Sequence, residues 1–147
     1  MWGILVGSHG RTEVYKSMVL LKSSLVCLAL NIYHEARDQS TSGQLSVAEV
    51  TLNRVESKHY PNNVCGVVYQ KGKSACAFSW TCDGASDATH EKEAWEKSLS
   101  IAEIMLDKDS TITVVDGATH YHATSVTPYW ADDLKKIKQI GDHIFYK

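Results

Sequence analysis

The sequence predicts an α+β fold that is mostly helical, with a small hairpin or sheet beside one of the helices. Apolar residues recur at helical spacing in three stretches, whereas alternating apolar residues occur only in short segments. With 147 residues, of which 44% are hydrophobic and 22% charged, the chain has the size and composition of one globular domain. We therefore expect a single domain over residues 21–147, preceded by a loosely attached extension over residues 1–20.

The first helix is predicted to begin near Met18. Its apolar residues recur at steps of four, three and four, which places Leu21, Leu25, Leu28 and Ile32 on one face. Glu35 is the next residue of the same row. A carboxyl group therefore extends the apolar face to the end of the helix.

Two further helices are predicted over residues 42–56 and 88–107, each with one apolar face. Between them, residues 64–69 indicate a short helix. A turn at 71–73 and the alternating residues 78–81 indicate a small hairpin. The tail alternates over 112–115 and then becomes an aromatic and histidine-rich loop before the apolar residues 144–146.

Charge and hydropathy exclude some partners. The chain has 15 basic and 17 acidic residues and no run of lysines and arginines, so we do not expect it to bind nucleic acid. Its most apolar stretch, Met18–Leu30, is interrupted by polar residues and is too short to span a bilayer. The first residues do not resemble a signal peptide. We expect a monomer without an integral membrane segment.

The four cysteines leave their pairing open. Cys27 lies among helix-patterned apolar residues, where a buried free thiol is the expected state. Cys65, Cys76 and Cys82 could form one disulfide, and three pairings are compatible with the sequence. No Cys-x-x-Cys pair is present, so a zinc site is not expected, and no cofactor is predicted.

The position of Glu35 suggests a chemistry. Burial at the edge of a core penalises the charged form of a carboxyl group and raises its pKa. A carboxyl group that stays protonated can donate its proton to the leaving oxygen of a glycosidic bond. The structural alternative is an ordinary solvated glutamate at a helix end. Arg37 and Arg54 are expected either to pair with a nearby acid or to form surface ion pairs.

A series of motifs runs along the chain in a fixed order. The motifs are Ile32-Tyr33-His34-Glu35-Ala36-Arg37, Gly43-Gln44, Val47-Ala48, Leu52-Asn53-Arg54-Val55, Tyr60-Pro61, Val67-Val68-Tyr69-Gln70, Phe78-Ser79-Trp80, Thr119-His120-Tyr121-His122-Ala123, Pro128-Tyr129-Trp130 and Ile140-Gly141-Asp142-His143-Ile144-Phe145. Together they resemble the SleB/CwlJ-type cell wall hydrolases, which include spore-cortex-lytic enzymes and many phage and bacterial peptidoglycan hydrolases. The resemblance covers residues 25–146.

This resemblance implies a lysozyme-like α+β fold. It also implies cleavage of peptidoglycan between N-acetylmuramic acid and N-acetylglucosamine. The spore-lytic members are lytic transglycosylases, and their catalytic glutamate lies in a Glu-Ala-Arg motif that corresponds to Glu35 here. The residue before it is often glycine in those enzymes and is His34 in this chain. A hydrolytic muramidase is the alternative and needs a second carboxylate, for which Asp83 is a candidate and an Asp-Gly turn the simpler interpretation.

Sugars bind to aromatic faces and to polar groups in a groove. The candidate substrate-binding residues are Tyr69, Gln70, Ser79, Trp80, Tyr121 and His122.

Two other function classes stay open. The pair His120 and His122, with His34 or Cys82 as a third ligand, would suit a zinc-dependent amidase. A non-catalytic wall-binding module is the second. We expect the protein to act on the cell wall or in the periplasm. It would be either a phage endolysin, made in the host cytoplasm and released through a pore formed by another protein, or a bacterial enzyme.

Overall fold

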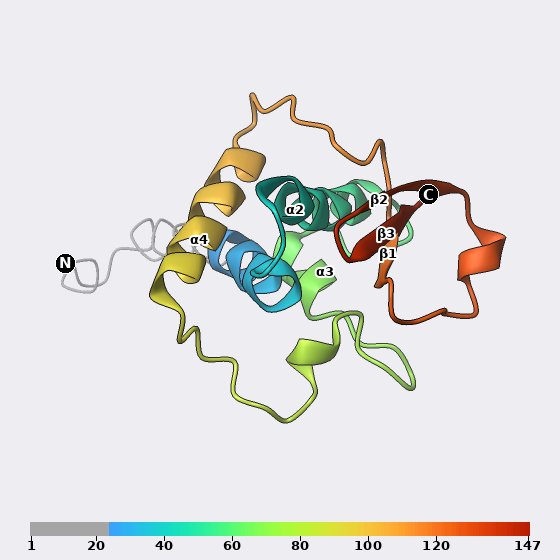
Figure 1. Cartoon of the computed structure of the whole chain (residues 1–147), viewed down its shortest axis with the longest axis horizontal. Coiled ribbons are helices and arrows are strands. Elements are labelled where there is room, and N and C mark those ends of the chain that lie inside the picture. The colour runs from blue at the N-terminus through green and yellow to red at the C-terminus, as the bar shows by residue number, and fades with distance from the viewer. Residues whose placement is uncertain (1–23) are drawn as a thin grey trace, which may run out of the picture.

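The structure is a computed structural model that describes residues 24–147. The predicted extension over residues 1–20 and the start of the predicted first helix lie outside the described residues. From residue 24 onward the chain forms helices first and then a small antiparallel sheet near its C-terminal end (Figure 1). The architecture is therefore α+β and mostly helical, as the sequence predicts.

The first described helix runs from residue 24 to residue 36 and carries Glu35 in its last turn; we call it the Glu35 helix. It is followed by α2 (Thr41–Glu56), α3 (Val64–Val68) and α4 (Lys92–Leu106). In Figure 1 the Glu35 helix lies beside α4, with the sheet on its other side. No helix within the described residues is both long and apolar enough to cross a membrane.

Local capping explains where α2 and α3 begin. The Ser40 Oγ accepts a hydrogen bond from the backbone N–H of Gly43 at 3.1 Å, which caps α2. The Asn63 side chain caps α3 in the same way by accepting from Gly66 N at 2.7 Å. Both helices therefore start within one residue of their predicted positions.

The start of α4 is later than predicted. Residues 88–91 are not helical, and the backbone N–H of Glu91 donates to Tyr33 Oη at 3.0 Å. Tyr33 belongs to the Glu35 helix, so this bond ties the chain before α4 to that helix. As a result Glu91 lies close to the end of the Glu35 helix.

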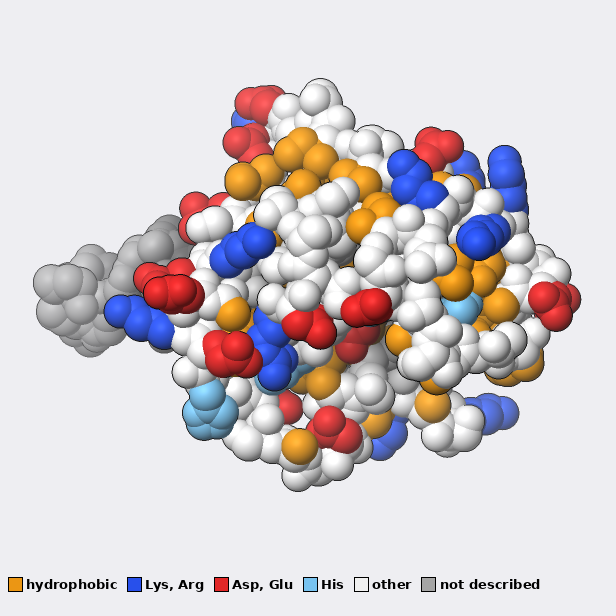
Figure 2. Space-filling view, viewed as in Figure 1, with side chains coloured by type: hydrophobic (Ala, Val, Ile, Leu, Met, Phe, Trp, Pro, Cys, Tyr) orange, Lys and Arg blue, Asp and Glu red, His pale blue; other side chains and the backbone are white. Residues whose placement is uncertain are grey.

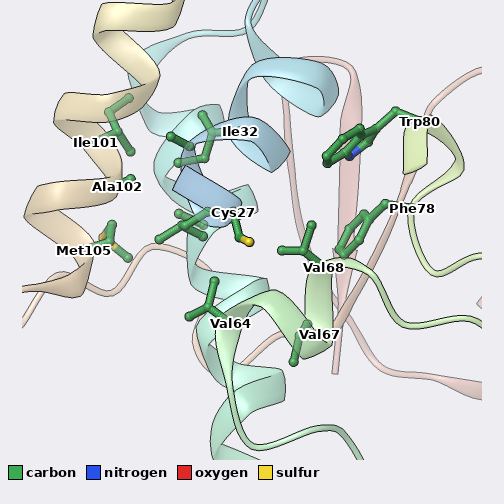
Figure 3. Packing of buried hydrophobic residues seen from close by; sticks show 13 residues of the cluster. Cys27, Ile32, Val64, Val67, Val68, Phe78, Trp80, Ile101, Ala102 and Met105 are labelled. Atoms are coloured by element: carbon green, nitrogen blue, oxygen red, sulfur yellow. The ribbon is translucent and has the colours of Figure 1, made fainter. Parts of the chain in front are cut away.

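One apolar cluster joins the helices. The Glu35 helix contributes Cys27, Leu28 and Ile32, each less than a tenth exposed. Figure 3 shows side chains of α4 on one side of this helix and side chains of α3, with Phe78 and Trp80, on the other. The burial of Leu28 and Ile32 confirms the predicted core face of the first helix.

Three strands form the sheet: β1 (His120–Ala123), β2 (Lys136–Ile140) and β3 (His143–Tyr146). Their order is β1-β3-β2 and both pairs are antiparallel, so β3 is central and β1 is an edge strand. Gly141 in the turn between β2 and β3 has a φ of +57°, which favours glycine. A second apolar cluster connects this sheet to α2: Ala36, Val47, Val50, Val115, Ala118 and Phe145.

The predicted strand at residues 78–81 is wrong. Ser79–Thr81 forms a short 3-10 helix, and the hairpin is reduced to a single bridge between Lys71 and Cys76. The Thr81 hydroxyl donates to Phe78 O at 2.8 Å, and Trp80 Nε1 donates to Asn31 Oδ1 at 2.8 Å. The side chains of Phe78 and Trp80 therefore both reach the core from a tight turn. This turn explains why apolar and polar residues alternate here although no partner strand is present among the described residues.

The alternation over residues 112–115, although typical of a strand, does not produce one. The backbone N–H groups of Val114 and Val115 bond the side chain of Glu49 instead of a neighbouring strand. β1 and β2 fall in the segment that the sequence indicated to be a loop, because their histidines and lysines hide the alternation. The closing apolar residues 144–146, which follow the expected loop, lie within β3.

The cysteines form two disulfides, Cys27–Cys65 and Cys76–Cys82, so the expected free thiol at Cys27 is wrong. The first bridge joins the Glu35 helix to α3 across 38 positions of sequence, and the second closes the short loop that contains Ser79–Thr81. Cys27 does face the core, as its helical position predicts. The sequence carries no signal that α3 places Cys65 next to it.

Candidate active site

Glu35 lies at the end of its helix, half-buried, where β1 passes the helix. Tyr121 of β1 donates its phenolic hydrogen to Glu35 Oε1. Burial raises the pKa of Glu35, while the hydrogen bond from Tyr121 and the positive charge of Arg54 partly counteract that rise. The net effect is a carboxyl group that keeps its proton to a higher pH than a solvated glutamate.

Tyr121 is held in its neutral form. Burial and the adjacent carboxyl group of Glu35 raise the pKa of Tyr121 well above its usual range. The phenol therefore acts as a fixed donor to one oxygen of Glu35. The other carboxyl oxygen is then the one that can carry the exchangeable proton.

Arg54 of α2 supplies the positive charge near this pair. Its Nε donates to Thr119 O at 2.8 Å, and its guanidinium lies over the rings of Tyr60 and Phe78, 5.0 and 5.3 Å from their centroids. These contacts fix the guanidinium in place without a direct salt bridge to Glu35. Arg54 thus tempers the pKa of the acid from a distance.

α2 also holds the chain that leads into β1. The buried side chain of Glu49 accepts from the N–H groups of Val114 and Val115 at 2.6 and 3.1 Å. Asn53 Nδ2 donates to Ala118 O at 2.8 Å, one helical turn further along α2. Since β1 begins at the next residue but one, these contacts set where Tyr121 meets Glu35.

Hydrogen bonds join the residues that follow the Glu35 helix to the turn between β2 and β3. The Gln39 side chain donates to Asp142 Oδ2 at 3.0 Å and accepts from Asp142 N at 3.1 Å. Gly141 is packed so closely against Gln39 that a Cβ there would collide with it. His143, the first residue of β3, is buried, and its ring lies edge-on to the ring of Tyr121.

A pocket of about 460 Å³ opens in front of Glu35. Its wall is strongly polar, and Arg37 Nε donates to Glu91 Oε2 at 2.6 Å across it. Figure 2 shows acidic, basic and histidine side chains gathered on this face of the molecule. The lining residues are His34, Glu35, Arg37, Asp38 and Glu91. Asp38 and Glu91 were not identified as site residues from the sequence, and Glu91 reaches the pocket only through tertiary packing.

Three aromatic side chains pack against one another beside this pocket. His34 stacks on Trp80 with centroids 4.5 Å apart, and Tyr69 meets the same indole edge-on at 5.7 Å. Trp80 is 6% exposed and hydrogen-bonded to Asn31, so it acts as a support for His34. Tyr69 is 46% exposed, so part of its side chain is accessible to solvent.

The remaining predicted residues lie in different places. Ser79 is exposed next to Trp80, and Gln70 is half-buried after α3, where its carbonyl accepts from Ala77 N at 2.9 Å. Neither lines the pocket around Glu35. Asp83 is exposed and accepts from Ala85 N at 2.9 Å, which is the turn geometry of the simpler interpretation.

His122 is not brought to Glu35. It follows Tyr121 in β1 and therefore points to the other face of the sheet. There its Nε2 hydrogen-bonds Tyr146 Oη at 2.8 Å. Among residues 24–147 no group of three or more His, Cys, Asp or Glu side chains is arranged to hold a metal ion, and Cys82 is bonded to Cys76. The third ligand required by the zinc hypothesis is thus not found beside His120 and His122.

A family model described as cell wall hydrolase matches residues 38–146. The chain belongs to this cell wall hydrolase family. The match begins three residues after Glu35. This finding confirms the resemblance seen in the sequence motifs.

Curated members of the family are similar over most of this chain. The spore cortex-lytic enzyme of Halalkalibacterium halodurans is 33% identical over 119 residues, which are 80% of this chain and 33% of that protein. The enzyme of the same name from Bacillus subtilis strain 168 is 32% identical over 80% of this chain and 35% of its own length. The chain thus spans about a third of the length of these relatives.

Solved structures match over nearly their whole length. The catalytic domain of the Bacillus cereus SleB protein has a TM-score of 0.63 and 31% identity, covering 85% of this chain and 91% of that one. The catalytic domain of the germination-specific lytic transglycosylase SleB from Bacillus anthracis has a TM-score of 0.64 and 30% identity, covering 84% and 93%. These similarities confirm the α+β fold of the cell wall hydrolase family.

Proposed function

We propose that this protein degrades peptidoglycan by cleaving the glycosidic bond between N-acetylmuramic acid and N-acetylglucosamine, with Glu35 as general acid and then general base. The observation that carries the proposal is the half-buried Glu35, raised in pKa and fixed by Tyr121 at the wall of a polar pocket. The similarity to SleB catalytic domains supports the same substrate class.

The chemistry needs one carboxyl group. Protonated Glu35 donates its proton to the glycosidic oxygen as the bond to the anomeric carbon breaks, and positive charge develops on the sugar. The C6 hydroxyl of the same muramic acid attacks the anomeric carbon, and the Glu35 carboxylate takes the hydroxyl proton. The product is a 1,6-anhydro end, and Glu35 regains its starting protonation state.

A hydrolytic muramidase is the second candidate, and one observation favours it. Asp38 lines the same pocket as Glu35 and is solvent-exposed, so it could activate a water molecule. Glu91 is less suited because it is paired with Arg37. Asp38 replaces Asp83 as the second carboxylate to test.

Product analysis distinguishes these reactions. Purified sacculi are digested with the full chain, and the soluble fragments are examined by mass spectrometry. Anhydro ends indicate transglycosylation, reducing ends indicate hydrolysis, and free stem peptides with intact glycan would contradict both. Asp38→Asn should abolish hydrolysis but leave transglycosylation, and Asp83→Asn is the matched control on an exposed turn.

The other hypotheses have their own tests. A zinc-dependent amidase would lose activity in EDTA, and lysis that persists in chelator removes that hypothesis. A wall-binding module would pull down glycan without releasing fragments, and would do so equally well after Glu35→Gln. An action outside the cytoplasm is part of the proposal, and release from a phage-infected host stays a prediction.

A further inference from the structure

A second pocket lies on the face of the sheet that is turned away from Glu35. Its volume is about 440 Å³, within the range of small-ligand sites. It is formed by β1, the connection from residue 124 to residue 134, and the neighbouring strands β2 and β3. None of its lining residues lines the pocket around Glu35.

The aromatic side chains at the base of this pocket are already packed against and hydrogen-bonded to one another. His122 stacks on Tyr146 with centroids 5.3 Å apart, and the two side chains hydrogen-bond each other at 2.8 Å. Trp130 packs edge-on against both rings. The rings therefore form a rigid base and have few polar atoms left with which to match the hydroxyls of a sugar.

The rim carries two opposite charges. Lys136 of β2 and Asp132 of the short 3-10 helix Ala131–Asp133 line the same pocket, and both are exposed. Within residues 24–147, neither Lys136 nor Asp132 takes part in an ion pair; the ion pair found there joins Arg37 and Glu91. Apolar side chains, among them Val126 and Leu134, fill the wall between strand and loop. A cation, an anion and an apolar wall in one pocket match a ligand that is itself both charged and aliphatic.

The pocket and the proposed cleavage site share strand β1. Tyr121 reaches Glu35 from one face of β1, and His122, the next residue, forms the floor of the pocket on the other face. β1 is an edge strand, and it lies between the two sites together with the Tyr121 side chain. A stem that connects the two sites would pass around the free edge of β1, and an extended tripeptide spans up to about 10 Å.

We infer that this pocket binds the peptide stem of the substrate, with Lys136 facing a stem carboxylate and Asp132 a stem ammonium group. The inference rests on the proposed function, because a stem is attached to the muramic acid of the glycan. A neutral glycan would not use the two opposite charges. Binding of the stem would raise the local concentration of the glycan at Glu35 without taking part in the chemistry.

The first experiment measures binding of the free stem. The Glu35→Gln variant of the 147-residue chain is titrated with the tripeptide L-Ala-γ-D-Glu-meso-diaminopimelate and followed by NMR. We expect weak binding with shifts centred on the pocket residues. Lys136→Met and Asp132→Asn should each weaken it about two- to fivefold. Lys138→Met and Asp133→Asn are matched controls on the same elements, outside the pocket, and should leave the affinity unchanged.

The second experiment measures turnover on two substrates. For the unmodified protein, KM should be several-fold lower on intact sacculi than on glycan strands stripped of their stems, with a similar kcat. The double variant Lys136→Met/Asp132→Asn should lose this difference, and Lys138→Met/Asp133→Asn should keep it. A double variant that keeps the full KM difference would overturn the inference.

Other results separate this inference from the proposed function. Absence of binding at millimolar tripeptide, or equal affinity in all four variants, overturns the stem pocket and leaves glycan cleavage standing. Shifts at the pocket caused by a GlcNAc disaccharide instead of the tripeptide also overturn it. Tripeptide binding by a protein that cleaves neither substrate supports the pocket and contradicts the proposed function.

Discussion

Two carboxyl groups, Glu35 and Glu49, occupy contrasting regions: Glu35 meets Tyr121 of β1, and Glu49 bonds the segment that leads into β1. Glu49 is 5% exposed and accepts two backbone N–H groups, from Val114 and Val115. Glu35 accepts one hydrogen bond, from a phenol, and borders an open pocket. A carboxylate whose oxygen is occupied by backbone donors holds the fold together. One that is desolvated yet still open on one side is available for proton transfer.

The largest expected effect tests the reactive region. Glu35→Gln keeps the shape of the side chain but cannot give or take the proton, so kcat should fall by about 10²–10⁴-fold. The release of soluble fragments from sacculi measures the loss, and circular dichroism checks that the fold is retained. Full activity in this variant would contradict the assignment of Glu35.

The second prediction concerns the structural region. Glu49→Ala leaves two buried backbone N–H groups without an acceptor and should lower the free energy of unfolding by about 1–3 kcal/mol. Thermal or denaturant unfolding measures the change. Glu56→Ala, at the exposed end of the same helix, is the control and should stay within about 0.5 kcal/mol of the unmodified protein. Equal stability of both variants would show that Glu49 is dispensable for the fold.

The third prediction sharpens the role of Tyr121. A general acid must be protonated, so activity should fall as the pH rises through the pKa of Glu35. The hydrogen bond from Tyr121 lowers this pKa, and Tyr121→Phe removes it. The alkaline limb of the kcat/KM profile should therefore move to higher pH. Tyr129→Phe, on a side chain that is 91% exposed, is the control. A limb that moves to lower pH would contradict this role.

The smallest expected effect is on the pH dependence of stability. Because the pKa of Glu35 is raised by folding, the folded state holds this proton more tightly than the unfolded state. The associated stability is present below the ordinary glutamate pKa and is lost as the pH rises through the folded pKa. Glu35→Gln escapes that loss, so its Tm should exceed that of the unmodified protein by more at about pH 7 than at about pH 4. An equal difference at both pH values would count against a buried, raised Glu35.

Prediction from the sequence succeeded where information is local. The row ending in Glu35 and the apolar faces of α2 and α4 follow from helical periodicity, because neighbours along one helix face share the same environment. The motifs around Glu35 and Tyr121 indicated the family. The sequence also marked Trp80 and Tyr69 as aromatic neighbours of the site, although it could not tell which of the two is buried.

Prediction failed where polar residues or turns conceal the pattern. Residues 78–81 alternate like a strand, yet no partner strand lies beside them, so they form a 3-10 turn. β1 and β2 do pair through β3, although their histidines and lysines gave no clear alternation. Strand formation depends on a distant partner, whereas helix formation is satisfied within the segment.

The sequence by itself determined the helices, the apolar row that ends at Glu35 and the family. Only the tertiary structure decided that Tyr121 meets Glu35 across 86 positions, that Cys27 pairs with Cys65, and that His122 faces away from the site. The physical reason is that a sequence pattern reports which face of an element is buried. The partner that covers this face is selected by the packing of all the elements together.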